Sequence, residues 1–192
     1  MIIRLIAALL LCCLGMHAAA FDVEYVTSVA CANRHGHCVS VSTAQRIVQA
    51  VHVQASLQDV PEDLVWRVMH VESKFNPEAR SKSGAIGLMQ VIPYWHRDKI
   101  AGRSLRIIEV NVEVGVAILR EYLTRYRTTQ AALQAYVGNR NTLVYSRSVF
   151  AVKKVKYQQP HTSAIQLQLQ EDPTYSRLDN RYRQDIAAES TG

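Results

Sequence analysis

The stretch Val65–Pro93, "VWRVMHVESKFNPEARSKSGAIGLMQVIP", places a single carboxylate on an apolar run and follows it with a glycine-rich turn. Apolar side chains recur in and just before this run at spacings of three and four residues, which predicts a helix from about Val60 to Phe75. The apolar stripe consists of Leu64, Val68, Val71 and Phe75. Glu72 lies late on this helix, one turn after Val68.

Its apolar surroundings make Glu72 a candidate general acid. Burial disfavours the charged form of a carboxyl, so such a group can hold its proton near neutral pH and donate it to a leaving group. Helix spacing alone also allows a solvated Glu72 that caps its own helix or pairs with Lys74 or Arg67.

The residues after Glu72 offer contacts that suit a large, polyhydroxylated and N-acetylated ligand. Hydroxyls, a thioether and an amide follow in the chain. They belong to Ser73, Ser81, Ser83, Met89 and Gln90. Gly84 and Gly87 allow close backbone approach or a positive φ. The alternative, a tight turn that binds no ligand, would explain only the two glycines.

The rest of the chain up to residue 157 also follows a helical pattern. Helical spacing begins at Ala44, and Asp59 with Glu62 has the spacing of a capping box. "LMQVIPYWHRDKI" predicts a short helix that ends near Pro93. Because "RIIEVNVEVGVAILREYLTRYR" continues too far for an ordinary strand, we predict a helix there despite its alternating valines.

Two more helices are predicted before the chain becomes polar. "TQAALQAYVGNRN" gives a helix stopped by Gly138, and "LVYSRSVFAVKKVKY" gives another with Val144 among its apolar markers. Residues 158–192 lack a sustained stripe and are expected to form a polar, flexible tail.

The first twenty residues have the features of a cleaved export signal. Arg4 precedes an apolar run shorter than the ~20 residues of a membrane-spanning helix, and Ala18–Ala20 supply small residues for a peptidase. We expect residues 1–20 to be a signal peptide, with a periplasmic or secreted product and no stable membrane anchor. A retained anchor and lipid attachment at Cys12 or Cys13 are the alternatives.

Two cysteines follow that segment, Cys31 and Cys38. In an exported chain such a pair predicts a disulfide. A metal site that adds His35 and His37 is the alternative, but the spacing matches no familiar zinc motif, so no metal is expected. Residues 21–44 are expected to form an N-terminal leader, extended over residues 21–39, that this disulfide pins.

The net charge of +6 is spread along the chain rather than massed in one block. Removal of Arg4 with the signal peptide would leave +5. A basic excess is a weak argument for an anionic partner surface. No basic stripe is interleaved with aromatic residues, so we expect no nucleic-acid partner.

The segment "VESKFNPEARSKSGAIGLMQVIP" resembles the signature of the lytic transglycosylases of the soluble-transglycosylase, goose-lysozyme-like class. That signature is Glu-Ser, a loop ending Ser-Gly-Ala-x-Gly-Leu-Met-Gln, and then Pro. "NVEVGVAILREYL" is similar to the family's Asn-x3-Gly-x3-Leu helix, and "ALQAYVG" to its Ala-Tyr-Asn-Ala-Gly segment. In the last motif Val137 replaces the Asn, and one residue before Gly138 is missing.

This resemblance covers roughly residues 45–157. It implies an all-α, lysozyme-like single domain with a substrate cleft beside the helix that carries Glu72. Glu72 would be the catalytic acid, which Ser73 would orient unless it contacts the sugar, and Tyr136 would aim its hydroxyl at Glu72. The other substrate-binding residues would be Ser83, Gly87, Leu88, Met89 and Gln90.

The family's reaction uses one carboxyl and no cofactor. Glu72 would protonate the oxygen between N-acetylmuramic acid and N-acetylglucosamine, and would then accept the proton of the muramyl 6-hydroxyl as a 1,6-anhydro ring closes. A hydrolase normally needs a second carboxylate. The available ones, in polar contexts, are Glu78, Asp98, Glu109 and Glu113. A hydrolytic lysozyme and a non-catalytic peptidoglycan-binding module are the alternatives.

The expected partners are peptidoglycan glycan strands, with the chain acting as a monomer. An exported, single-domain transglycosylase of this kind resembles those that open the wall for a secretion, conjugation or pilus apparatus. A phage role or a role in general wall turnover is the alternative.

Overall fold

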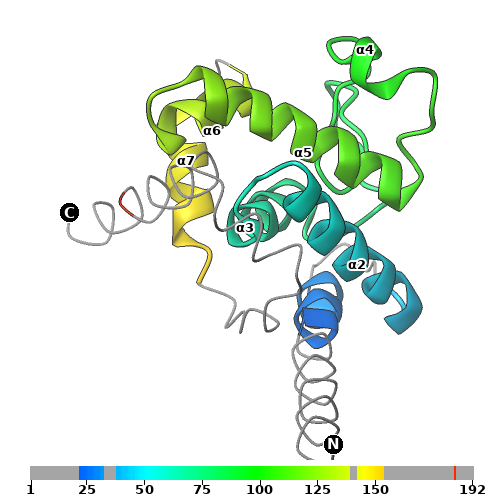
Figure 1. The fold of residues 1–192 in the computed structure, drawn as a ribbon. Helices are drawn as coiled ribbons and strands as arrows, with labels where there is room; N and C mark the ends of the chain where they lie inside the picture. The colour runs from blue at the N-terminus through cyan, green and yellow to red at the C-terminus, as the bar shows by residue number, and fades with distance from the viewer. Residues whose placement is uncertain (1–21, 33–37, 139–141, 154–183, 185–192) are drawn as a thin grey trace, which may run out of the picture.

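The computed structural model describes residues 22–32, 38–138, 142–153 and Gln184 (Figure 1). A helix over residues 22–32 is followed by α2 (Val41–Leu57), α3 (Glu62–Ser73), α4 (Arg97–Ile100), α5 (Ile108–Arg125), α6 (Thr129–Val137) and α7 (Thr142–Ala151). In these ranges β pairing is limited to isolated bridges around Ile86. The all-α prediction is confirmed. The predicted signal peptide and, except for Gln184, the predicted tail lie outside the described residues.

Helix α3, which carries Glu72, is the most deeply buried element. Seven of its twelve residues are buried, and five apolar side chains among them are almost fully enclosed. These side chains are Leu64, Val65, Trp66, Val68 and Met69. Helices α2 and α7 pack against α3, and α5 packs against α2 and α6 (Figure 1). The end of α3 is therefore held by a packed core.

The start of α3 differs from the capping-box prediction. Pro61 occupies the N-cap position, and no side chain caps the helix. Asp59 has a positive φ of 58°, and its carboxylate pairs with Arg120 of α5 at 3.3 Å. Its carboxylate thus ties the α2–α3 turn to α5.

Helix α3 ends with two consecutive residues in the left-handed region, Lys74 and Phe75, with φ of 53° and 62°. Such values are uncommon outside glycine. The Phe75 ring is fully buried and packs edge-to-face against Trp66 and Tyr25, which holds this reversal of the chain. The loop after Glu72 therefore leaves the helix in a fixed direction.

The predicted helix in "LMQVIPYWHRDKI" is wrong. Residues 87–90 and 93–95 form turns on either side of a β-bridge residue, Val91, and the only helical turn of this segment is α4, which begins after Pro93. In contrast, the segment with alternating valines is the helix α5, as predicted. The prediction of Val144 as an apolar marker of the last helix is also wrong, because Val144 is 64 % exposed while Tyr145 and Val149 face the core.

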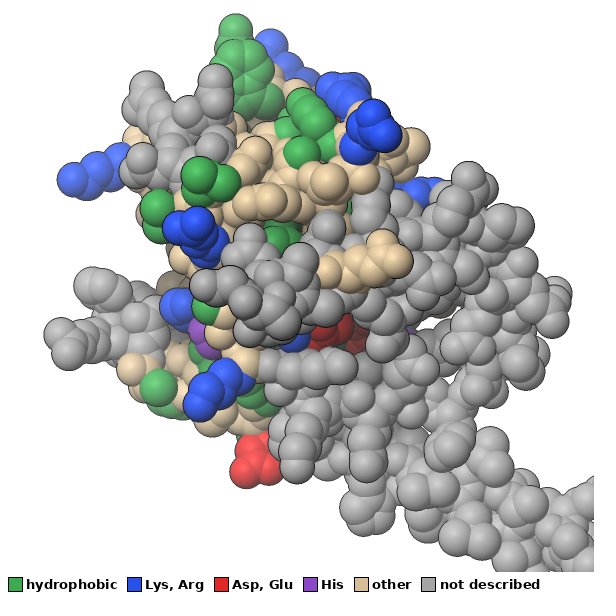
Figure 2. Space-filling model, turned by 90° about the vertical axis from the view of Figure 1, so that its left-hand side faces the viewer, with side chains coloured by type: hydrophobic (Ala, Val, Ile, Leu, Met, Phe, Trp, Pro, Cys, Tyr) green, Lys and Arg blue, Asp and Glu red, His purple; other side chains and the backbone are tan. Residues whose placement is uncertain are grey.

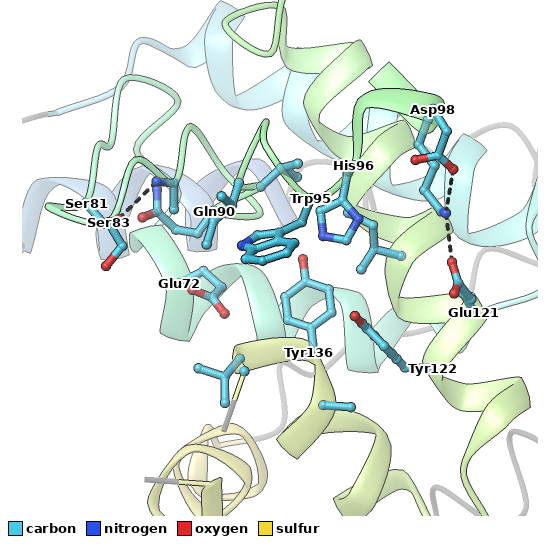
Figure 3. A pocket seen from close by; sticks show the side chains of 18 residues that line it. Glu72, Ser81, Ser83, Gln90, Trp95, His96, Asp98, Glu121, Tyr122 and Tyr136 are labelled. Atoms are coloured by element: carbon cyan, nitrogen blue, oxygen red, sulfur yellow. Dashed lines mark hydrogen bonds and ion pairs between the residues drawn. The ribbon is translucent and has the colours of Figure 1, made fainter. Parts of the chain in front are cut away.

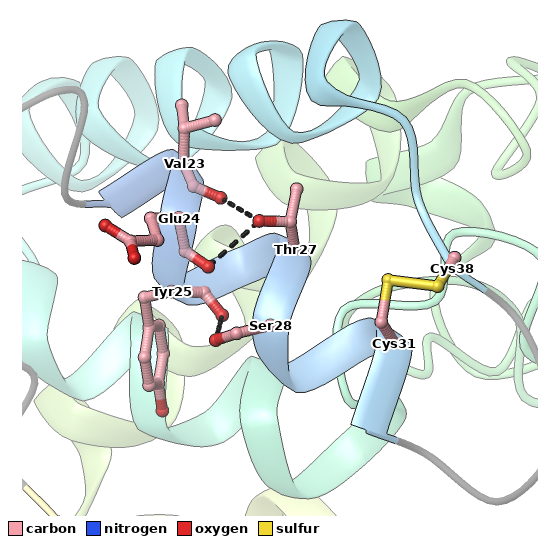
Figure 4. The surroundings of a disulfide bond; sticks show 7 residues. All are labelled: Val23, Glu24, Tyr25, Thr27, Ser28, Cys31 and Cys38. Carbon is pink, nitrogen blue, oxygen red and sulfur yellow. Dashed lines mark hydrogen bonds between the residues drawn. A yellow bond between two sulfur atoms is a disulfide. The ribbon is translucent and has the colours of Figure 1, made fainter.

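The N-terminal leader is helical over residues 22–32, not extended. Val26 and Ala30 of this helix are buried in the core, and the Tyr25 hydroxyl is hydrogen-bonded to Nδ1 of His70 on α3 at 2.8 Å. The predicted disulfide is confirmed: Cys31, near the helix end, is bonded to Cys38, which precedes α2 (Figure 4). The bond closes the short connection between two packed helices.

The surface carries its basic side chains at separate places. Figure 2 shows one face, where described Lys and Arg side chains are interspersed with hydrophobic and polar ones. Among the described residues, several basic side chains are paired with carboxylates, including Arg46 with Glu109 and Arg103 with Glu113, each at 2.8 Å. Within the described ranges, none of the helices combines the length and apolar character that a membrane crossing requires.

Candidate active site

Glu72 projects from the last turn of α3 into a cavity of about 730 Å³ (Figure 3). Its Oε1 accepts a 2.5 Å hydrogen bond from the hydroxyl of Tyr145 on α7. Burial raises the pKa of the Glu72 carboxyl to about 7, while the Tyr145 hydrogen bond acts in the opposite direction. The group therefore holds a proton over the range in which a general acid works best.

The alternative of a surface Glu72 paired with Arg67 does not fit this geometry. The Arg67 guanidinium is itself buried, donates to Asp63 Oδ2 at 2.9 Å, and donates to the carbonyls of Phe150 and Val152. It joins α3 to the end of α7, the helix that supplies Tyr145. Arg67 thus fixes the two helices whose side chains meet at Glu72.

Two further carboxylates, Asp98 and Glu121, line the opposite side of the cavity (Figure 3). The ammonium of Lys99 lies between them, 3.2 Å from Asp98 and 2.7 Å from Glu121. These hydrogen bonds lower the pKa of both carboxyls. Both are therefore ionised near neutral pH, so Glu72 is the carboxyl lining this cavity that can act as a proton donor.

The glycine-rich turn supports the cavity from behind, and one of its residues, Gln90, lines it. Leu88 and Met89 are fully buried in the core, and Gly87 is buried against Asn111. The expectation that all four residues line the cleft is corrected for these three. The buried residues Leu88 and Met89 hold the turn in the core, and Gln90 faces the cavity.

The Gln90 side chain is held in place by the loop. Its Nε2 donates to the carbonyls of Gly87 and Ala79, at 2.9 and 3.3 Å. Both amide hydrogens are thereby engaged, so the Oε1 acceptor is the part of this amide available to a ligand.

Asn111 and Gly115 explain the spacing Asn-x3-Gly in α5. Asn111 Oδ1 accepts from the Met89 N–H at 2.9 Å, and its Nδ2 donates to the carbonyls of Ile86 and Leu105 at 2.9 and 3.0 Å. One helical turn later, Gly115 lies so close to Met89 that a Cβ there would be 2.3 Å from the Met89 Cβ. These two positions let the turn rest directly on α5.

The serines near Glu72 separate into two groups. Ser73 is buried and donates to the Met69 carbonyl at 3.3 Å, so a contact from Ser73 to a ligand in the cavity is not supported. Ser81 and Ser83, on the loop after α3, line the cavity beside Glu72 (Figure 3). Ser81 Oγ also accepts from the Ala85 N–H at 3.0 Å, which shapes this loop.

Tyr136 lines the cavity, but its hydroxyl does not bond to Glu72. It donates to the Met89 carbonyl at 2.8 Å and so ties α6 to the glycine-rich turn. The tyrosine that reaches the carboxyl is Tyr145, which the sequence prediction missed. The local pattern gave no signal for this role, because a buried tyrosine usually finds some hydrogen-bond partner and only the packing of α7 on α3 decides which one.

Residues beyond the signature complete the cavity. They include Trp95 and His96 after the glycine-rich turn and Tyr122 on α5. Val137 and Gly138, from the motif that departs from the family pattern, also line it. The altered motif therefore places an apolar side chain at the cavity rim.

The comparison with protein families agrees with this geometry. The family model described as the transglycosylase SLT domain matches residues 49–157. The chain belongs to the transglycosylase SLT family. Its all-α arrangement around the Glu72 helix is the lysozyme-like fold that the sequence resemblance implied.

Curated relatives of this SLT-family chain are similar over part of their lengths. The "Transglycosylase" of Enterobacteria phage PRD1 is 39 % identical over 83 residues, which is 41 % of this chain and 29 % of that protein. The "Membrane-bound lytic murein transglycosylase C" of Histophilus somni (strain 2336) is 43 % identical over 51 residues, 27 % of this chain and 14 % of that protein. The protein of the same name from Yersinia pestis (strain Pestoides F) is 36 % identical over 86 residues, which is 40 % of this chain and 24 % of that protein. The chain thus matches less than a third of the length of these relatives.

Proposed function

We propose that the chain is a peptidoglycan lytic transglycosylase. It would cleave the β-1,4 bond between N-acetylmuramic acid and N-acetylglucosamine and leave 1,6-anhydromuramoyl products. The observation that carries this proposal is the Glu72 carboxyl in the cavity, whose pKa burial raises to about 7, opposite two carboxylates that both pair with Lys99. The proposed substrate agrees with the names of the relatives.

In the first step Glu72 gives its proton to the glycosidic oxygen. The bond from the muramyl C1 to that oxygen breaks, and N-acetylglucosamine leaves with a 4-hydroxyl. Positive charge develops at C1, where the 2-acetamido group of the same sugar supports it. The Tyr145 hydroxyl, which is hydrogen-bonded to Oε1 of Glu72, stabilises the carboxylate that this step creates.

In the second step the Glu72 carboxylate acts as a base. It takes the proton of the muramyl 6-hydroxyl while the oxygen of that hydroxyl bonds to C1. The acid is thereby restored, and no water is consumed. A hydrolytic lysozyme would instead need a carboxylate free to activate water, and the pairing of Asp98 and Glu121 with Lys99 argues against one in this cavity.

The test is mass spectrometry of purified peptidoglycan after digestion with the protein and with Glu72→Gln. Muropeptides that end in 1,6-anhydromuramic acid are expected with the unmodified protein. Loss of the general acid should slow their release by roughly 10²–10⁴-fold. Glu78→Gln is the matched control, because Glu78 is exposed on the following loop and does not line the cavity.

Two results would contradict the proposal. Products heavier by one water would identify a hydrolase. Binding to the wall without any cleavage by the unmodified protein would identify a non-catalytic module and draw attention to the altered segment around Tyr136 and Val137.

We further propose that the chain acts in the periplasm or is secreted, where it would open the wall for a secretion, conjugation or pilus apparatus. Support comes from the export-signal pattern in residues 1–20 and from the Cys31–Cys38 disulfide, a bond that persists in oxidising compartments. Cell fractionation with an antibody against the chain, followed by crosslinking in intact cells, tests both parts. Recovery in the cytoplasm, or crosslinks to the wall alone, would contradict them.

A further inference from the structure

Trp95 is an exposed aromatic residue on the wall of the cavity that contains Glu72. It is 69 % exposed, although an indole is a large apolar group. Exposed apolar residues are common on protein surfaces, so exposure alone would carry no meaning. Here the exposed ring lines the same cavity as Glu72, so a ligand that fills this cavity would meet it.

The indole is presented by a braced turn. The backbone N–H of Trp95 donates to the Ile92 carbonyl at 3.2 Å, and the turn contains Pro93, whose ring restricts φ. The Tyr94 ring packs edge-to-face on Trp95 with centroids 4.7 Å apart, and the Arg97 guanidinium lies 5.0 Å from the Tyr94 centroid. A side chain held in this way loses little freedom when a ligand binds.

Trp95 is placed between two groups of residues that line the cavity. In Figure 3 its indole lies between the side that carries Glu72, Ser81 and Ser83 and the side that carries Asp98 and Glu121. The first side holds the proton donor, and the second holds a network of fixed charges around Lys99. A glycan that contacts both groups of lining residues would therefore have the indole within its reach.

We infer that Trp95 is a stacking platform for one pyranose ring of the glycan strand, next to the sugars joined by the bond that is cut. The inference rests on the proposed function for the identity of the ligand. In a β-1,4-linked N-acetylglucosamine-type ring the substituents are equatorial, so the flat faces present C–H groups. The π face of an indole is negative and attracts them while apolar area leaves water.

The braces predict an order of effects among neighbouring residues. Tyr94 does not line the cavity and acts on a ligand only through Trp95. Of the variants, Trp95→Ala should therefore weaken glycan binding most. Trp95→Phe, which keeps a smaller ring, and Tyr94→Ala should each have a smaller effect than Trp95→Ala. Leu57→Ala is the matched control, because Leu57 is 70 % exposed and does not line the cavity.

The chain offers a direct probe of this contact. It has two tryptophans, and the other, Trp66, is only 1 % exposed, so quenching of fluorescence by acrylamide reports on Trp95. The protein carrying Glu72→Gln is titrated with the β-1,4 hexasaccharide of N-acetylglucosamine, which it should bind without cleavage. Acrylamide quenching should fall as the hexasaccharide saturates the protein.

Affinity is measured in the same background by calorimetry, with each Trp95, Tyr94 and Leu57 variant added. Removal of one stacked ring should raise the Kd for the hexasaccharide about tenfold in Trp95→Ala. An unchanged Kd in Trp95→Ala, undiminished quenching at saturation, or absence of hexasaccharide binding would each overturn the inference. The first two results would leave Trp95 as a surface aromatic for another partner.

Digestion of peptidoglycan with Glu72 intact separates this inference from the proposed function. Anhydro products together with an unchanged Kd in Trp95→Ala would keep the transglycosylase and reject the platform. Protection of Trp95 by the hexasaccharide without any cleavage of peptidoglycan would keep the platform in a glycan-binding protein and reject the transglycosylase.

Discussion

The hydroxyl of Tyr145 is the one side-chain group hydrogen-bonded to Glu72 among the described residues. This bond favours the ionised carboxyl and so lowers the pKa that burial raises. In Tyr145→Phe the pKa of Glu72 should therefore rise further above 7. Because activity is lost when the acid ionises, the alkaline limb of the pH–rate profile should move to higher pH.

The rate maximum of Tyr145→Phe should also fall, roughly tenfold, since the carboxyl loses its orienting contact. Peptidoglycan solubilisation measured between pH 5 and pH 10, as assay conditions, gives both quantities. A lower rate with an unshifted alkaline limb would mean that Tyr145 only packs. Tyr126→Phe serves as the control, because Tyr126 is on the surface and does not line the cavity.

Glu72 should reduce the stability of the fold at neutral pH. Its pKa is about 7 in the folded chain and near 4.5 in the unfolded chain, so the unfolded state binds fewer protons between these values. The free energy of unfolding therefore decreases as pH rises from about 4.5 to about 7. Glu72→Gln removes this loss and should stabilise the protein by up to about 3 kcal/mol above pH 7.

Urea titrations of Glu72→Gln and the unmodified protein at several pH values measure this difference. The two curves should converge near pH 4, where both side chains are neutral, and separate as pH rises. Equal stability at pH 8 would show that Glu72 is solvated in the folded protein, in contradiction to its placement in the cavity.

At the scale of elements, α5 supports the glycine-rich turn through Asn111. The side chain of Asn111 is buried and makes three hydrogen bonds to backbone groups of two loops. Asn111→Ala would leave these groups without partners in the core, so the free energy of unfolding should fall by roughly 3 kcal/mol. Chemical denaturation tests this value, with Asn76→Ala, on an exposed turn, as the control.

Replacement of Gly115 by alanine should destabilise the fold, although such a replacement in a helix usually stabilises it. In a helix interior, Gly to Ala normally stabilises by about 1 kcal/mol. In Gly115→Ala the new Cβ would lie 2.3 Å from the Met89 Cβ, so the turn must move. Thermal unfolding should therefore show a lower Tm, and activity should fall because Met89 holds Tyr136. An unchanged or higher Tm would contradict this account.

The elements themselves were largely predictable, and the errors have physical causes. The helices α3, α5 and α6 follow from apolar spacing, which tertiary packing only reinforces. The segment before Pro93 forms turns in which Asn111 and Tyr136 hydrogen-bond to the backbone N–H and carbonyl of Met89, and neither partner is visible locally. The N-terminal helix was missed because it is stabilised by burial against α3 rather than by a clear pattern.

At the scale of the whole molecule, the Cys31–Cys38 bond joins the N-terminal helix to α2. The closed loop has a sequence separation of 7, so its removal should lower the free energy of unfolding by only about 2 kcal/mol. The double variant Cys31→Ser, Cys38→Ser should keep its activity at 25 °C, because neither residue lines the cavity.

Urea titration and peptidoglycan digestion of this double variant give the two readouts. Unchanged stability would show that the helix over residues 22–32 is held by packing alone. Loss of digestion at 25 °C with the fold retained would mean that the helix positions α3 through Tyr25 and His70.

The sequence by itself determined the all-α class and the family, and it predicted Glu72 as the acid. These follow from local spacing and from a signature in which Glu72 is set among apolar residues. Only the tertiary structure decided that Leu88 and Met89 are core residues, that Tyr136 bonds to Met89 and that Tyr145 reaches Glu72. Such contacts join residues far apart in the chain, and they depend on how whole helices pack, which no local pattern specifies.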